Sequence, residues 1–169
     1  SKPQKRGVQG GFFARTMCRE EFVAHGLDTD YVQQNTSFSA RKGTLRGMHY
    51  QVSPYAEAKL VRCIKGALVD VIVDLRRDSP TYMNHESFEL DEENRRQLYV
   101  PRGFAHAFQT VSDNVEVNYL VSAPYVPSAE RGLRYSDPAL RITWPLPVTV
   151  ISDKDASWPL LGREPTVVF

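Results

Sequence analysis

A strict alternation of apolar and polar residues is the feature that most constrains the fold of this chain. The segment 66–75, GALVDVIVDL, repeats with a period of two, which is the side-chain period of a β-strand. One face of that strand is apolar throughout and carries Ala67, Val69, Val71, Val73 and Leu75. The opposite face carries Leu68, Asp70, Ile72 and Asp74. In the segment 115–121 the same period groups Val115, Val117, Tyr119 and Val121.

The rest of the chain repeats this pattern in short pieces. Further strands are predicted at 11–17, 31–38, 59–65, 87–90, 97–100 and 107–111, and 43–51 is also mostly strand-like. Turn signals separate them at 65–66, 76–81, 101–103 and 112–114. Helical patterns are confined to 18–25, which Gly26 ends, and to one turn at 92–96. Many short strands with even spacing predict an all-β sandwich or barrel with a few short helices.

Composition limits the domain organisation and the class of protein. We expect one domain over residues 1–169, with an N-terminal strand arm and an irregular C-terminal segment from 144 to 169. The net charge of +1 gives no reason to expect nucleic-acid or membrane binding. Two cysteines, Cys18 and Cys63, predict free thiols rather than a disulfide framework. No apolar run reaches the length of a membrane span and no signal-peptide pattern is seen, so we expect a cytoplasmic protein.

The richest segment for chemistry is GTLRGMHYQ at 43–51, read together with Lys59. Arg46 can hold a phosphate, the imidazole of His49 can take up or release a proton, and Lys59 can stabilise an oxyanion. A lone histidine in a strand is more often structural, and the two cationic neighbours favour the functional interpretation. Arg46 and His49 are an odd number of residues apart, so a regular strand would send them to opposite faces. Gly47 permits a bulge that would bring both into one cavity.

Four other residues have a structural and a functional interpretation. His106, in PRGFAHAF, is either a core histidine or a site residue, and Tyr119 is either a core aromatic or a proton donor. Tyr125 lies on a predicted loop and can stack on a flat ring, and Asp155 is either a solvated acid or a partner that orients an imidazole. We expect His25 and His85 at the surface. The sequence has no HxH or HxxxH pair, so no metal site is expected.

Ten segments together resemble the dTDP-4-dehydrorhamnose 3,5-epimerase family, over almost the whole chain. Their order and spacing carry the resemblance. They are GFF at 11–13, VQQNTS at 32–37, GTLRGMHYQ at 43–51, KLVRCIKG at 59–66, VDVIVDLRRDSPTY at 69–82, LYVPRGFAHAFQT at 98–110, APYVPSAE at 123–130, YSDP at 135–138, ITWP at 142–145 and ISDKDA at 151–156. The resemblance implies a cupin-like double-stranded β-helix (a jelly-roll barrel), a homodimer, and no metal or organic cofactor. The implied small-molecule partner is a nucleotide-linked 4-keto-6-deoxy sugar.

The resemblance also implies residue roles. The general base falls on His49, its supporting carboxylate on Asp155, the proton donor on Tyr119, and the oxyanion-stabilising lysine on Lys59. The diphosphate contact falls on Arg46 and the thymine-stacking tyrosine on Tyr125. Further ligand contacts fall on Gln33, Gln34, Asn35, His106, Glu130 and Lys154.

One segment departs from the family pattern. The family usually reads RGFFxE near the N-terminus, whereas this chain reads GGFFAR, with Gly10 in place of the arginine and Arg15 in place of the acid. An arginine–phosphate contact is thereby lost, and Arg15 is expected to supply a positive charge from a nearby position. Four alternatives to a double epimerase stay open: a single-centre epimerase, an epimerase of another nucleotide sugar, a 3,4-ketoisomerase and a non-catalytic binding module.

Overall fold

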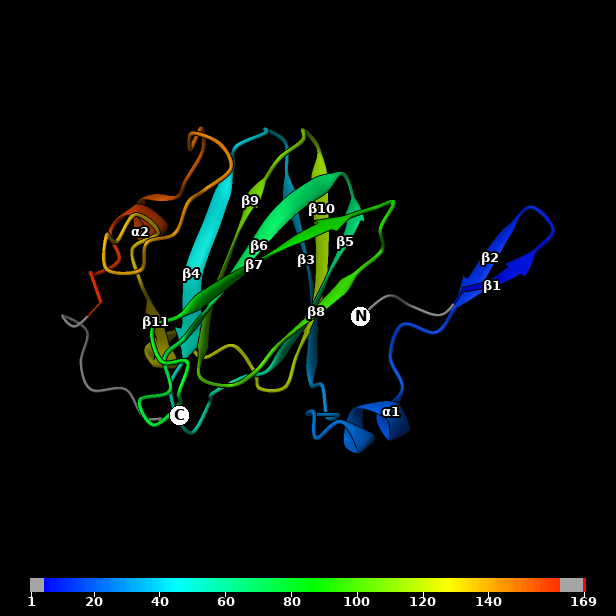
Figure 1. Ribbon diagram of the computed structural model, residues 1–169, viewed down its shortest axis with the longest axis horizontal. Coiled ribbons are helices and arrows are strands. Elements are labelled where there is room, and N and C mark those ends of the chain that lie inside the picture. The colour runs from blue at the N-terminus through cyan, green and yellow to red at the C-terminus, as the bar shows by residue number, and fades with distance from the viewer. Residues whose placement is uncertain (1–4, 162–168) are drawn as a thin grey trace.

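The computed structural model describes residues 5–161 and 169, without the side chains of residues 5, 6 and 8, and shows the all-β jelly roll that the sequence predicts. A four-stranded sheet has the order β3-β10-β5-β8, and a five-stranded sheet has the order β11-β4-β9-β6-β7. Both are antiparallel and pack face to face (Figure 1). A separate hairpin, β1–β2, extends away from the two sheets.

The elements have the following bounds. The four-stranded sheet contains β3 (Gln33–Ser39), β10 (Val115–Val121), β5 (Lys59–Lys65) and β8 (Gln97–Val100). The five-stranded sheet contains β11 (Glu130–Gly132), β4 (Leu45–Gln51), β9 (Phe104–Thr110), β6 (Ala67–Asp74) and β7 (His85–Asp91). The hairpin contains β1 (Lys5–Val8) and β2 (Gly11–Ala14), and the helical elements are α1 (Arg19–Ala24), a 3₁₀ turn (Pro127–Ala129) and α2 (Asp153–Ala156).

Most predicted elements are confirmed, three strands to the residue: 59–65, 97–100 and 115–121. The single turn predicted at 92–96 is present but does not extend into a helix, and the Arg95 N–H donates to the Asp91 carbonyl at 3.0 Å. The side chain of Asp91 accepts hydrogen bonds from the backbone N–H groups of Glu93 and Asn94, so the segment forms a side-chain-capped turn. Arg95 then has a positive φ of 51°, which ends any helical path.

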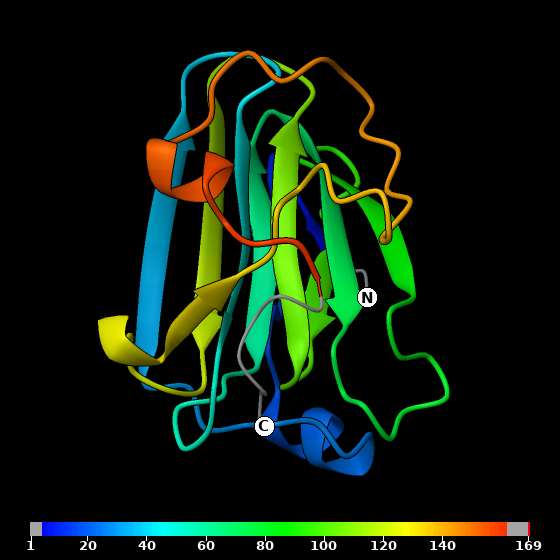
Figure 2. The ribbon, with the colours of Figure 1, turned by 90° about the vertical axis from the view of Figure 1, so that its left-hand side faces the viewer.

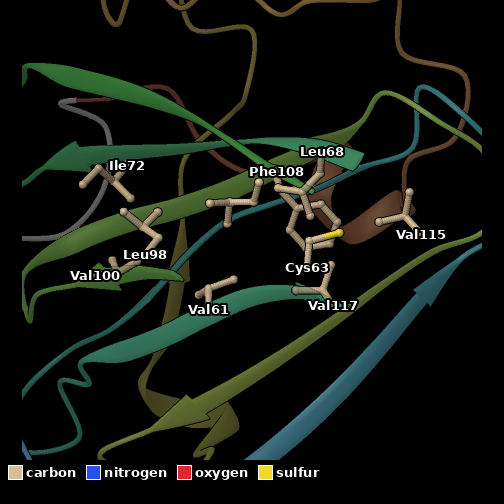
Figure 3. Packing of buried hydrophobic residues seen from close by; sticks show 10 residues of the cluster. Val61, Cys63, Leu68, Ile72, Leu98, Val100, Phe108, Val115 and Val117 are labelled. Carbon is tan, nitrogen blue, oxygen red and sulfur yellow. The ribbon is translucent and has the colours of Figure 1, made fainter. Parts of the chain in front are cut away.

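An apolar core lies between the two sheets. Val61 and Cys63 of β5 and Val117 of β10 face Leu68 and Phe108 of the opposite sheet (Figure 3). These strands continue beyond the core, where the inward positions become polar. Lys59 shares the inward face of β5 with Val61, and Tyr119 shares that of β10 with Val117. The alternation that builds the core therefore also places polar side chains between the sheets.

A second apolar layer covers the outer face of the five-stranded sheet. Figure 2 shows the chain after β11 crossing that face. Leu133, Leu140 and Trp144 of this segment pack on Met48 and Val71, among others. The apolar face predicted for 66–75 is thus buried here, while Asp70 and Asp74 point inward and are 0% and 1% exposed. Of the C-terminal segment 144–169, residues 162–168 lie outside the described part of the chain.

The described residues contain no helix that is both long enough and apolar enough to cross a membrane.

Candidate functional site

Two adjoining cavities lie between the sheets, next to the apolar core. The first, of about 330 Å³, and the second, of about 260 Å³, share His49, Lys59, Tyr119 and Lys154. Gln33, Asn35, Glu57, Tyr125 and Glu130 help line the first cavity. Arg46, His106, Ser152 and Asp155 help line the second. Eleven of the thirteen residues that the sequence analysis singles out therefore meet in one place.

An irregularity in β4 lets Arg46 and His49 face the same cavity. The pairing of β4 with β9 shifts register between these two residues, as the sequence predicted from Gly47. Gly47 has a φ of +114°, and a Cβ there would lie 2.5 Å from the carbonyl oxygen of His106. Only glycine fits this position, because both the backbone conformation and the space exclude a side chain.

His49 is bonded to Asp155 in α2. The Nε2 atom lies 2.6 Å from Oδ1 of Asp155, and the other carboxylate oxygen accepts the backbone N–H of Gly47 at 3.1 Å. Burial on its own would raise the pKa of Asp155, but the bond and charge of His49 lower it overall. The carboxylate is therefore ionised near neutral pH and can only accept. Nε2 must carry the proton, which leaves the Nδ1 lone pair of a neutral His49 available as a base.

Tyr119 and Lys59 reach the cavities from the opposite sheet. Lys59 Nζ lies 3.3 Å from a carboxylate oxygen of Glu57, and both side chains are nearly buried. Burial, and next the negative charge of Glu57, raise the pKa of the Tyr119 phenol, whereas Arg46 lowers it. Tyr119 is consequently a protonated hydroxyl over the working range of an enzyme, and Lys59 is an ammonium with a counter-charge.

A second imidazole–carboxylate pair lies beside the first. His106 of β9 is the direct register partner of His49, and its Nε2 atom lies 2.7 Å from Asp70 Oδ1. Asp70 is fully buried, so the pair presents the imidazole to the cavity with the carboxylate behind it. The sequence analysis did not single out Asp70 or Glu57. The sequence offered one signal for each of them. Asp70 is an acid within a mostly apolar strand, and Glu57 is an acid two residues before Lys59.

The mouth of the first cavity has a polar network. Lys154 Nζ lies 3.0 Å from Glu130 Oε2, and the Tyr125 hydroxyl donates to the same oxygen at 3.0 Å. This bond to Glu130, followed by burial, raises the pKa of Tyr125. Gln33 donates to the side chain of Asn35, and both line the cavity. The flat, half-exposed ring of Tyr125 is thus held at the entrance.

Arg46 has a different environment from the other cations. Its guanidinium donates to Ser39 Oγ at 3.0 Å and to the Phe38 carbonyl at 2.9 Å, which are both neutral oxygens. Among the described residues no carboxylate forms an ion pair with Arg46. Its full positive charge is therefore available to an anionic group of a ligand.

Two predicted site residues are not brought to the cavities within this chain. Gln34 lies on the outward face of β3, where it donates to Asn118 at 2.8 Å, because its neighbours Gln33 and Asn35 occupy the inward positions. Arg15 follows the hairpin, is exposed and lies 3.9 Å from Glu21. Gly10 is in the turn that joins β1 to β2.

The described residues contain no group of three or more His, Cys, Asp and Glu side chains placed to hold a metal ion.

Comparisons with known proteins agree on one family. The sequence profile described as dTDP-4-dehydrorhamnose 3,5-epimerase matches residues 1–163. A protein of that name from Sinorhizobium fredii is 46% identical over 165 residues, covering 97% of this chain and 85% of the relative.

Solved structures give the same result. The dTDP-4-dehydrorhamnose 3,5-epimerase of Bacillus anthracis, with TDP and PPi bound, superposes with a TM-score of 0.91 at 41% identity, over 95% of this chain and 91% of that one. The dTDP-6-deoxy-D-glucose-3,5-epimerase of Legionella pneumophila, in complex with dTDP-4-keto-L-rhamnose, gives 0.87 at 38% identity, over 94% and 85%.

Proposed function

Because this chain belongs to the dTDP-4-dehydrorhamnose 3,5-epimerase family, we propose that it inverts C3 and C5 of dTDP-4-dehydro-6-deoxy-D-glucose to give dTDP-4-dehydro-L-rhamnose. One geometric observation carries the proposal. His49 on β4 and Tyr119 on β10 line the same cavities from opposite sheets. Inversion of a carbon centre needs a base and an acid on opposite faces of the sugar ring, and these two residues satisfy that need.

The reaction begins with loss of a proton next to the ketone. In our proposal the Nδ1 atom of neutral His49 takes the proton from the carbon, and Asp155 stabilises the resulting imidazolium while holding the ring in its tautomer. The electron pair of the C–H bond moves to the carbonyl oxygen and forms an enolate. Lys59 stabilises this oxyanion, and His106, whose Nε2 atom lies 2.7 Å from Asp70 Oδ1, faces the same cavity.

Reprotonation from the opposite face completes the inversion. Tyr119 donates its hydroxyl proton to the carbon, and the enolate collapses back to the ketone. Once the His49 imidazolium has released its proton to solvent and the Tyr119 phenolate has taken one up from solvent, the same two residues serve the second centre after the ring has been repositioned. We assign the diphosphate to Arg46, the base ring to Tyr125, and the remaining contacts to Gln33, Asn35, Glu130 and Lys154.

Proton NMR of dTDP-4-keto-6-deoxyglucose in deuterated buffer tests this function. We expect the protein to remove both the C3 and the C5 proton signals. Loss of one signal would identify a single-centre epimerase. Absence of exchange would contradict the epimerase proposal for this nucleotide sugar.

The variant His49→Asn tests the base. We expect the exchange rate to fall by about a thousandfold, the scale of general base catalysis, with folding intact. His25→Asn is the matched control, since His25 is exposed at the end of α1, where its ring bonds the carbonyl of Glu21. Exchange at the normal rate in His49→Asn would contradict the assignment.

The variant Tyr119→Phe tests the acid. We expect inversion to fall more than proton exchange, because the phenol acts after the proton has left. An equal loss of both would show that Tyr119 is not the dedicated donor.

We also propose that the protein acts as a homodimer in the cytoplasm. The exposed phenylalanines of the β1–β2 hairpin support self-association, and the free thiols of Cys18 and Cys63 fit a reducing compartment.

A further inference from the structure

Trp158, which follows α2, contacts the two residues of the His49–Asp155 pair. Its indole Nε1–H donates to Oδ1 of Asp155 at 3.2 Å, the same oxygen that accepts from His49. Its ring meets the imidazole edge-on, with centroids 6.0 Å apart and planes at 75°. The ammonium of Lys154 lies 5.9 Å from the indole centroid on another side. One aromatic ring thus borders three residues of the site.

The indole occupies a slot that exists only because residue 132 is glycine. A Cβ at Gly132 would lie 2.3 Å from Cδ2 and Cε2 of Trp158, a distance that no side chain can accept. Gly132 of β11 is the register partner of His49 on β4. The neighbouring strand β11 therefore has no side chain at the position beside the proposed base where the indole lies.

Two hydrogen bonds from Arg134 hold the backbone of Trp158 and Pro159 in place. Arg134 Nε donates to the Trp158 carbonyl at 3.0 Å, and the Arg134 N–H donates to the carbonyl of Pro159 at 3.0 Å. Trp158 is not among the described residues that line either cavity. Its effect on a substrate must accordingly pass through Asp155 and His49.

We propose that Trp158, seated against Gly132, is a positioning residue for the catalytic pair. This role rests on the proposed function, and in it the indole has two tasks. Its N–H holds the Asp155 carboxylate in the plane that accepts the Nε2 proton of His49, and its ring blocks rotation of the imidazole away from the cavity. Positioning of this kind matters because a small displacement of a catalytic group has a large effect on rate.

The first experiment separates kcat from KM in Trp158→Phe. Phenylalanine keeps a ring in the slot and removes the N–H, so we expect kcat to fall about tenfold with KM unchanged. The matched control is Trp144→Phe, which loses a comparable bond from Nε1 to the Tyr135 carbonyl, of 2.8 Å, in the outer apolar layer. We expect that control to keep its kcat. A normal kcat in Trp158→Phe would overturn the proposal.

A double-mutant cycle tests the slot. Gly132→Ala should lower kcat because its methyl group displaces the indole, and it should have little further effect in the Trp158→Ala background, where the slot is empty. Equal effects of Gly132→Ala in both backgrounds would overturn the link between the two residues.

A third measurement does not depend on epimerase activity. The ¹⁵N signals of the His49 ring report its tautomer, and they can be assigned by their loss in His49→Asn. We expect the Nε2–H tautomer alone in the native protein and in Trp144→Phe, and a mixture of tautomers in Trp158→Phe. A single tautomer in all three would overturn the proposal, even if the native protein proved inactive on dTDP-4-keto-6-deoxyglucose.

Discussion

Most cationic and imidazole side chains at the cavities have a carboxylate beside them. The pairs are His49–Asp155, Lys59–Glu57, His106–Asp70 and Lys154–Glu130. Pairing is what makes burial of these charges tolerable, since an isolated buried charge is strongly unfavourable. Arg46, which bonds neutral oxygens, is the exception in this group. The excess positive charge of the site is thus concentrated at Arg46, and an anionic ligand group is attracted there.

Burial, and next the charge of Glu57, raise the pKa of the proposed proton donor Tyr119. Glu57→Gln should therefore lower that pKa. The alkaline limb of the inversion rate should then begin at lower pH than in the native protein. Phenolate absorbance, compared between Glu57→Gln and Glu57→Gln/Tyr119→Phe, measures the same shift directly. An alkaline limb at the native position would contradict this role of Glu57.

Gly47 is the residue on which the geometry of β4 depends. In Gly47→Ala the new methyl group meets the His106 carbonyl and Ala107. We expect a loss of at least about 2 kcal/mol in the free energy of unfolding, from overpacking and backbone strain. Urea denaturation measures it. Gly7→Ala is the control, because no described atom beyond its two chain neighbours lies within 4 Å of a Cβ built at Gly7.

At the scale of elements, the loop after β6 is organised by one carboxylate. Asp74 is almost fully buried and accepts bonds from Arg76, Ser79 and Thr81. Burial alone would raise the pKa of Asp74, but the Arg76 guanidinium and the two hydroxyl donors lower it far below its ordinary value. The loop 75–84 therefore closes around a charge that stays ionised.

This arrangement predicts acid lability. A carboxylate whose folded pKa lies below its unfolded pKa contributes stability above the unfolded value, and the contribution is lost as the pH falls through the folded one. Asp74→Asn should lower the free energy of unfolding by about 2–4 kcal/mol at neutral pH, and by less as the pH falls below about 4. Denaturation at a series of pH values measures both the loss at neutral pH and its decrease at low pH. The exposed Asp78 of the same loop supplies the control Asp78→Asn, with an expected change within about 0.5 kcal/mol. A constant difference at all pH values would contradict the prediction.

At the scale of the whole molecule, the β1–β2 hairpin stands apart from the two sheets of its own chain. Figure 1 shows β1 and β2 extending from the sheets, and Phe13 on β2 is 64% exposed. A two-stranded hairpin is marginally stable alone, and an exposed aromatic ring favours association. A second copy of the chain supplies the missing surface in the dimer that we propose.

Substitution in the hairpin tests that dimer. Phe13→Ser should weaken self-association by about tenfold or more, as removal of a buried interface aromatic does. Sedimentation velocity over a range of concentrations measures it. Val23→Ser, at an equally exposed position of 62% on α1, is the control. A native-like dimer in Phe13→Ser would show that the interface lies elsewhere, and a monomeric native protein would contradict the dimer itself.

The sequence by itself determined the strands and much of the site. Side-chain alternation is local, so it correctly separated the two faces of β6 and placed Tyr119 on the same face of β10 as Val117, but it did not say which face of β6 points inward. The motif spacing identified His49, Lys59 and Asp155, which the fold brings together. At 92–96 the helical path ends after a single turn because Arg95 has a positive φ of 51°.

Only the tertiary structure decided which groups act on one another. Asp70, Glu57 and Trp158 gain their significance from contacts across strands or from a loop, and no period in the sequence encodes such contacts. Gln34 shows the converse, since its motif matched but the pleat of β3 turned it outward. Periodicity specifies the face of each element, whereas packing of the two sheets, and of the C-terminal segment on them, specifies its partners. That is why the proposed base could be named from sequence, whereas the residues that we propose to hold it in place could not.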